Sequence, residues 1–597
     1  MALSLTWDLE SIFVGGPTGE PFQRFVADLV RDIEALKSVL NEEPVPRDDA
    51  GAERLYGHLN ALQALGTRLR EAGAYLSCLT AQNVDDETAK RESTRLSSVS
   101  AAYAKALIRF DALLLGLSDD VFQSLKARAQ ADGLDFLLEE RRLMARERMA
   151  PELEALEADL AVDGYHAWGE LYNTIVGRLN VEVTIGGQTK RLSVGQAFNL
   201  LSHPDRAVRK QVFERYDAAW ESVADLNAEV LNHLSGYRLA VYRHRGWDDV
   251  LHEPLRNNRM RRETLEAMWA AVEKGKPALV RYLQQKARLL GLDALAFYDV
   301  DAPVGEAGAH IPYEDGAALI IEQFATFSAD LADLAERAFR ERWIEAEDRP
   351  GKRPGGFCTS FPLKQQSRIF MTYSGTPDNV STLAHELGHA YHQHVMNDLP
   401  AMAQRYAMNV AETASTFAEQ IVSEALIAKA DEGARLRLLD EKLSRAVAFF
   451  MNIHARFLFE TRFYEARKST PVPRETLGAL MLEAQREAYH GALGEWHANF
   501  WQSKLHFYLT RTPFYNFPYT FGYLFSTGLY AMAKAEGPSF ADRYVALLRD
   551  TGRMTVEALA EKHLGVDLTR ADFWEQAVDE ATRDVETFIR LAERQNG

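Results

Sequence analysis

The chain has 597 residues and a formal net charge of −18, a length that allows two lobes or one large domain around a deep cavity. A hydrophobic fraction of 47%, a charged fraction of 26% and only 37 Gly and 20 Pro are in the ordinary globular range and argue against a disordered or fibrous protein. The negative charge, with no stripe of Lys and Arg interleaved with aromatic residues, argues against nucleic acid as a partner.

The amino terminus and the cysteines indicate the compartment. Residues 1–10 lack both a basic start and an apolar stretch long enough for a signal peptide. Only two cysteines occur, Cys78 and Cys358, and their separation along the chain excludes a disulfide framework. We therefore expect a cytoplasmic protein in a reducing environment.

The amino-terminal third is predicted to be helical. Apolar residues recur at three- and four-residue spacing from residue 20 to about residue 117, and residues 42–49 interrupt this pattern as a loop with two prolines. Residues 181–194 alternate apolar and polar around a Gly-Gly pair, which predicts a β-hairpin. We place the domain boundary after this hairpin, so that residues 1–195 form an amino-terminal helical lobe and residues 196–597 a second domain, for which the motif described below predicts catalysis.

Helical patterns dominate again after residue 203, as in residues 265–290, and predict a mainly α fold. The two most apolar segments, residues 446–459 and 517–533, are either broken by polar residues or rich in Tyr and Gly. Neither has the roughly 20 unbroken apolar residues that a membrane span needs. Both are expected to be buried core, and no membrane partner is expected.

A second non-helical segment, residues 348–378, combines Pro and Gly turns with a short strand at residues 367–373. This strand leads directly into the helix that carries the motif described next. An exposed strand edge in this position could pair with the backbone of an extended peptide, which makes Met371 and Tyr373 candidate substrate-binding residues. The alternative is a strand that pairs only within the protein.

The most informative motif is H-E-x-x-H at residues 385–389, on a predicted helix that starts after the turn at residues 377–378. Residues four apart lie on one face of a helix, so His385 and His389 can both direct an imidazole nitrogen to one zinc ion. Glu386 lies one position round the helix and can take a proton from a water whose pKa the metal lowers toward ~7. This combination would supply a nucleophile at neutral pH.

A third metal ligand must come from elsewhere in the chain. The metzincin pattern needs Gly at position 392 and His at position 395, but this sequence has His392 and Val395. Downstream, a helical pattern places Glu412 and Glu419 seven residues apart on one face. We assign Glu412 as the third ligand and Glu419 as a partner that orients a ligand histidine. The alternative is that both are surface glutamates on a solvated helix.

Two other residues of the motif helix have open interpretations. His392 lies one turn beyond His389, but a catalytic metal keeps its fourth position open for water. His392 is therefore expected either to contact a metal ligand without binding the metal itself or to face solvent. Gly388 costs a helix about 1 kcal/mol, which indicates close approach of another backbone unless the glycine is incidental.

Attack of a metal-activated water on a carbonyl would create an oxyanion, and the segment from His506 to Phe525 is rich in groups that could hold it. Tyr hydroxyl and His N–H groups can donate hydrogen bonds to an oxyanion. The surrounding rings, including Tyr515 and Tyr519, could line a peptide-binding wall. Packing of these aromatic residues in the core is the alternative.

The chain resembles the oligoendopeptidase F family, relatives of thimet oligopeptidase, over most of its length. The resemblance is most specific at residues 385–392, 411–417, 351–357 and 506–525. It implies one Zn²⁺ per chain on His385, His389 and Glu412, with Glu386 as general base and later proton donor. It also implies that His506 and Tyr523 stabilise the transition state or hold the substrate.

The same resemblance implies a large helical shell of two lobes around a deep substrate channel, with a small β element beside the HExxH helix. Such a channel would admit oligopeptides and exclude folded proteins. The expected function is therefore that of a zinc endopeptidase acting on short unstructured peptides. An exopeptidase with the same site, and a binding protein with a vestigial motif, are the two alternatives. The oligomeric state and possible replacement of zinc by another divalent ion stay open.

Overall fold

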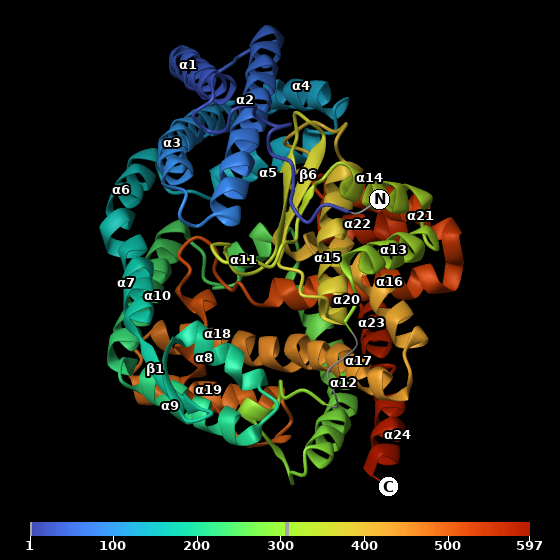
Figure 1. The fold of residues 1–597 in the computed structure, drawn as a ribbon. Helices are drawn as coiled ribbons and strands as arrows, with labels where there is room; N and C mark the ends of the chain where they lie inside the picture. Colours follow the sequence, from blue (N-terminus) through green and yellow to red (C-terminus); the bar gives the residue numbers. More distant parts are fainter. Residues whose placement is uncertain (1–2, 305–309, 597) are drawn as a thin grey trace.

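The computed structural model describes residues 3–304 and 310–596, and it is mainly α-helical. The first five helices form the upper part of the molecule in Figure 1. Their bounds are α1 Glu20–Glu42, α2 Asp49–Gln82, α3 Glu87–Gly116, α4 Asp119–Gln130 and α5 Asp135–Arg146. In α1 the buried residues include Phe22, Val26 and Leu29, which is the spacing of one helix face. The predicted run of amphipathic helices, with a loop before α2, is confirmed.

These helices share a hydrophobic cluster that runs from Trp7 to Leu138 and also takes in residues far along the chain. Phe361 and Phe370, from two strands near the HExxH helix, belong to it, as does Met402. Tyr172, by contrast, belongs to a larger cluster that extends to Ala592. The division at residue 195 stays a prediction.

The next elements run down one side of the molecule. They are α6 Pro151–Ala161, a π-helical turn Val162–His166, α7 Ala167–Arg178, β1 Asn180–Ile185, β2 Gln188–Ser193, α8 Val194–Asn199, α9 Arg206–Glu221 and α10 Ala224–Arg245. The β1–β2 hairpin turns at Gly186 and Gly187, whose φ angles of 58° and 78° suit a tight two-residue turn. The predicted hairpin is confirmed.

The remaining helices form the lower and opposite sides of the molecule. They are α11 His252–Asn257, α12 Arg262–Leu289, α13 Tyr313–Ala325, α14 Ala329–Arg340, α15 Pro377–His394, α16 Thr413–Lys429, α17 Glu432–Val447, α18 Ile453–Arg467, α19 Arg474–Ala488, α20 Phe517–Glu536, α21 Phe540–Asp550, α22 Val556–Leu564, α23 Ala571–Thr582 and α24 Val585–Asn596. A π-helical turn, Ala448–Asn452, joins α17 to α18. Among the described residues, no helix combines the length and the apolar character needed to cross a bilayer.

A three-stranded sheet lies next to the HExxH helix α15. Its strands are β4 Ile344–Glu345, β5 Phe357–Phe361 and β6 Gln366–Phe370, in the order β4-β6-β5. Strand β6 is antiparallel to β5 and parallel to β4, so it is the central strand and β5 is an edge. The other two strands, β3 Leu295–Ala296 and β7 Leu493–Glu495, pair with each other elsewhere.

The central position of β6 corrects one prediction. The amides of Met371 and Tyr373 donate to the carbonyls of Glu345 and Ala346, both over 2.9 Å. The side chain of Met371 is buried, and the hydroxyl of Tyr373 donates to the carbonyl of Ile311 over 3.0 Å. Because both amides are already paired, the exposed edge predicted at these two residues is wrong.

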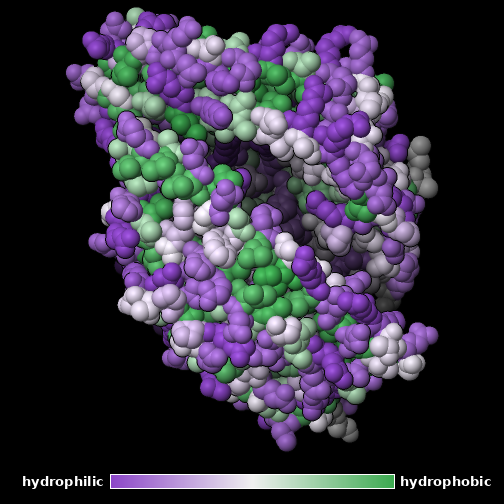
Figure 2. Space-filling view, turned by 90° about the vertical axis from the view of Figure 1, so that its left-hand side faces the viewer, coloured by the Kyte–Doolittle hydropathy of each residue, from purple (hydrophilic) through white to green (hydrophobic). Residues whose placement is uncertain are grey.

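The helices surround a central space. In Figure 1 they form a ring, with α1–α4 at the top, α6, α7 and α10 on one side, and α13–α16 on the other. The space-filling view of the neighbouring face shows the surface deeply hollowed near its centre (Figure 2). The mainly α, hollow architecture is the one expected, and it leaves α15 and α16 beside the interior.

Candidate metal centre

The local sequence fixes where α15 begins. The hydroxyl of Thr376 accepts a hydrogen bond from the amide of Asn379, and Asn379 bonds back to Thr376 as a capping box. Pro377 occupies the first helical position, where its missing amide hydrogen costs nothing. A helix starting here brings His385 and His389 onto the same face, one turn apart, as predicted.

Close packing of α15 on α16 brings the third candidate ligand to this face. A Cβ atom on Gly388 would lie 2.5 Å from the carbonyl oxygen of Ala414 and 2.6 Å from the Cα of Ser415. Only glycine fits such a crossing, so Gly388 marks a close backbone approach and is not incidental. Glu412 precedes α16 directly and faces the two histidines.

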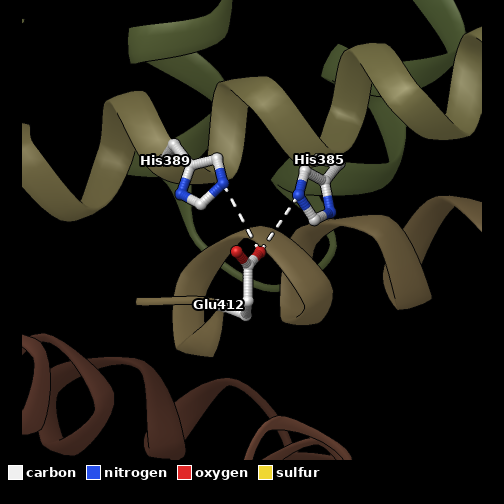
Figure 3. A group of neighbouring side chains, drawn as sticks. All are labelled: His385, His389 and Glu412. Carbon is white, nitrogen blue, oxygen red and sulfur yellow. Dashed lines mark ion pairs between the residues drawn. The ribbon is translucent and has the colours of Figure 1, made fainter. Parts of the chain in front are cut away.

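The two histidines and Glu412 converge on one point (Figure 3). The Oε2 atom of Glu412 lies 3.1 Å from Nε2 of His385 and 3.5 Å from Nε2 of His389. One potential ligand atom from each residue lies within 4.8 Å of the others. Two imidazole nitrogens and one carboxylate oxygen are a donor set that zinc takes in hydrolases, with a fourth position left for water.

The electrostatic environment suits metal binding. Burial lowers the pKa of His389 to about 4, so its imidazole is neutral, as a metal ligand must be. Burial alone would favour the neutral acid of Glu412, but hydrogen bonding and charge from His385 and His389 hold its pKa at about 2. The Ser415 hydroxyl also donates to Glu412, over 2.7 Å.

Glu419 lies behind His385, as predicted. The Nδ1 atom of His385 is 3.1 Å from Oε2 of Glu419, and the other oxygen of Glu419 pairs with Arg445 of α17. A carboxylate on the far nitrogen fixes which imidazole nitrogen faces the metal position. Sequence reasoning missed Arg445, because nothing in the pattern of α17 indicates which distant carboxylate it meets.

Glu386 occupies a buried position next to these residues. Its Oε2 atom has no hydrogen-bond partner among the described residues, and the backbone of Gly356 lies close to its Oε1. Burial raises the pKa of Glu386 to about 7, while the charge of His385 opposes the rise and that of Glu412 adds to it. A carboxyl with a pKa near neutrality can both accept and return a proton.

The metal position opens into a cavity of about 470 Å³ whose lining includes Tyr519 and Tyr523, so both lie at the site. The ring of Tyr523 stacks on Phe449 at 4.5 Å. The ring centroid of His506 lies 5.5 Å from that of Tyr515 and 6.1 Å from that of Tyr519. His506 therefore packs behind Tyr519, which itself lines the cavity. Several other aromatic residues of the same segment are core, namely Phe507, Phe514, Phe517 and Phe521.

His392 does not face solvent, which excludes one of its two interpretations. It is fully buried, its Nε2 lies 2.9 Å from the hydroxyl oxygen of Thr551, and its ring stacks on Tyr406 at 4.2 Å. Burial lowers its pKa to about 3, so the ring is neutral. His392 therefore supports α15 from behind.

Comparisons with known proteins give the class, that of the peptidases, and also the family. The model of Peptidase family M3 matches residues 199–580, and the model named Oligopeptidase F matches residues 114–180. The first match covers more than half of the chain. The chain belongs to peptidase family M3.

Curated relatives match across nearly the whole chain. Oligopeptidase PepF of Bacillus subtilis is 24% identical over 94% of this chain and 84% of its own length. The plasmid-encoded oligoendopeptidase F of Lactococcus lactis subsp. cremoris is 23% identical over 99% of this chain and 98% of its own length.

Solved structures share the fold. A chain from Chlamydophila abortus superposes with a TM-score of 0.85 at 18% identity, covering 99% of both chains. Oligoendopeptidase F from Enterococcus faecium superposes with a TM-score of 0.69 at 19% identity, covering 96% of this chain and 98% of its own. At these identities the likeness establishes the mainly α fold alone.

Proposed function

We propose that the protein is a zinc-dependent endopeptidase that hydrolyses internal bonds of short, unstructured oligopeptides. The observation that carries this proposal is the convergence of His385, His389 and Glu412, with the buried Glu386 beside them, on the wall of an interior cavity. These residues fit one zinc ion, which when bound would polarise a peptide carbonyl and lower the pKa of water. The names of the relatives, oligopeptidase and oligoendopeptidase, support the same substrate class.

Glu386 is proposed to move the protons of the reaction. Its carboxylate takes a proton from the attacking water and later gives that proton to the nitrogen of the leaving amine. Both transfers need a carboxyl that changes protonation state near neutral pH, which its burial favours. Glu419 and Arg445 hold His385 in place during this cycle.

Tyr523 and His506 are proposed to stabilise the oxyanion that forms at the carbonyl oxygen. Tyr523 lines the cavity directly, whereas His506 stands behind Tyr519. Burial lowers the pKa of His506 to about 4, so at neutral pH it can donate only as a neutral ring. Tyr515 and Tyr519 are proposed to contact the substrate.

The substrate backbone is proposed to lie against the sheet. Strand β5, and not the strand leading to Met371 and Tyr373, is the edge of the sheet that packs on α15. An extended peptide added to β5 would lie beside Glu386, since Gly356, directly before β5, approaches that carboxyl.

The cytoplasm stays the proposed location, and Cys78 and Cys358 are both free thiols, as a reducing compartment requires.

Mass spectrometry of an unstructured peptide of about ten residues, incubated with the purified protein, tests this function. Internal cleavage that a zinc chelator abolishes and added zinc restores is the expected result. Stepwise loss of residues from one end would replace the proposal with an exopeptidase. Absence of any cleavage by zinc-loaded protein would favour the binding protein instead.

A further inference from the structure

A second cavity of about 240 Å³ adjoins the cavity of the metal centre. Ala448 and Phe449, from the π-helical turn between α17 and α18, line both cavities, so the two cavities border the same turn. The second cavity is bordered mainly by apolar and aromatic side chains, among them Phe297, Tyr489 and Phe500. Its place beside the metal position makes it a candidate subsite for a neighbouring residue of a bound peptide.

Two cationic side chains line this second cavity, Arg456 of α18 and Lys504. The guanidinium of Arg456 lies over the ring of Phe500 at 5.4 Å, and the ammonium of Lys504 lies over the same ring at 4.9 Å. Within residues 3–304 and 310–596, neither has an ion pair within 4.0 Å, and the buried Nε of Arg456 has no hydrogen-bond partner. Both side chains are half-buried, and cations withdrawn from water are normally paired, so this arrangement leaves a place for an anion.

The ionisable groups around the two cations do not provide that anion. Among the described residues that line the cavity, Asp301 is the one acidic side chain. Burial lowers the pKa of Lys504 more than the charge of Asp301 raises it, and Asp301 forms no ion pair within 4.0 Å with either cation. Tyr489 and Tyr519 are neutral, since burial raises the pKa of both, and His506 is neutral because burial lowers its pKa. Burial lowers the pKa of Lys504 to about 7 and that of Arg456 to about 10, as expected for cations with too little counter-charge.

We propose that this cavity is a subsite that binds a carboxylate of the peptide substrate between Arg456 and Lys504. The inference rests on the proposed peptidase function and names the chemistry of its substrates. The carboxylate can come from an Asp or Glu side chain or from the carboxyl terminus of the peptide. The aromatic lining holds the apolar part of the same residue, and the two cations hold its charged end.

Peptide binding to the full-length Glu386→Gln protein tests the proposal, because binding is measured whether or not the protein is a peptidase. Four fluorescent peptides of about ten residues form two matched pairs. One pair differs only in a free or an amidated carboxyl terminus, and the other only in internal Glu or Gln. Fluorescence anisotropy gives the Kd of each, and the ratio of Kd values within a pair is the readout.

The carboxylate member of at least one pair is expected to bind about tenfold more tightly, as hydrogen bonds to charged groups typically contribute. The pair that shows the ratio identifies the source of the carboxylate. In the Arg456→Met, Lys504→Met double variant the ratio should fall to about one. Lys504→Arg should keep it, and Lys429→Met, which removes an exposed cation on α16, should leave it unchanged.

Equal Kd values within both pairs for the Glu386→Gln protein would overturn the proposal. A ratio of Kd values that persists in the folded Arg456→Met, Lys504→Met double variant would overturn it as well. Circular dichroism confirms the fold of each variant, and the two single Met substitutions replace the double variant if it does not fold. Cleavage by the wild-type protein is measured separately. Cleavage without carboxylate preference would therefore remove the subsite and leave the peptidase function standing.

Discussion

At the scale of single residues, Glu386 is the side chain whose loss should separate chemistry from binding. Glu386→Gln keeps the volume and removes the group that accepts the proton, so turnover should fall at least about 100-fold. Zinc content and the melting temperature should stay near those of the wild type, because His385, His389 and Glu412 are untouched. Peptide cleavage rates and metal analysis measure both, with the exposed Glu322→Gln as control. Normal turnover in Glu386→Gln would exclude the proposed proton transfers.

Glu419 should act on the metal through His385. Its replacement by Gln removes the charge that orients the imidazole and also the partner of Arg445. The affinity for zinc should fall about 10–100-fold, while saturating zinc restores most of the activity. Competition with a fluorescent chelator measures the affinity. Glu424→Gln, on the same helix and paired with Lys442, is the matched control. Equal zinc affinity in the two variants would show that Glu419 has only a structural role.

The metal ligands could be predicted from the sequence because their geometry is mostly local. His385 and His389 are one helical turn apart, and Glu412 and Glu419 share one helical pattern. The contact of Arg445 with Glu419, and the lack of an ion pair at Lys504 among the described residues, could not be predicted, since both depend on which distant segments pack together. The sequence does not indicate that Arg456 lines a cavity either, because a single arginine in a helical segment usually lies on the solvated face of the helix.

At the scale of elements, the crossing of α15 and α16 determines the metal geometry, and Gly388 determines the crossing. In Gly388→Ala a Cβ would overlap the backbone of α16, which would have to move away. We expect a loss of stability of about 1–3 kcal/mol together with weaker zinc binding. Gly57→Ala, in α2 with no atom within 4 Å of the new Cβ, should gain about 0.5–1 kcal/mol instead. Thermal melting with and without zinc compares the two, and unchanged zinc affinity in Gly388→Ala would contradict the role of this crossing.

Some helices and strands can be predicted from their own sequence, whereas the position of a strand within a sheet cannot. The helix α1 and the β1–β2 hairpin follow from periodicity and from a Gly-Gly turn, which are local properties. The place of β6 in its sheet does not, because a strand looks the same in sequence whether its neighbours are present or absent. For that reason the peptide-pairing edge was predicted one strand away from β5. The π-helical turn between α17 and α18 likewise has no sequence signal of its own.

At the scale of the whole molecule, the interior position of the site should select substrates by their shape. A segment of a small domain should be cut when the domain is unfolded, whereas the same segment should stay intact when the domain is folded. Mass spectrometry of a disulfide-linked domain before and after reduction compares the two states under one set of conditions. Equal cleavage of both would show that the site is accessible to folded surfaces.

The hydrophobic cluster of the amino-terminal helices has a consequence for protein engineering. Phe361 and Phe370 contribute to that cluster from β5 and β6, the strands that pack on the HExxH helix. Helices α1–α5 thus cover apolar side chains of the sheet, and we expect a chain without them to expose these side chains to water. A truncated chain that starts at α6 should be expressed as inclusion bodies. Coexpression of residues 1–146 as a separate chain should restore soluble protein, as measured by the soluble fraction of each lysate.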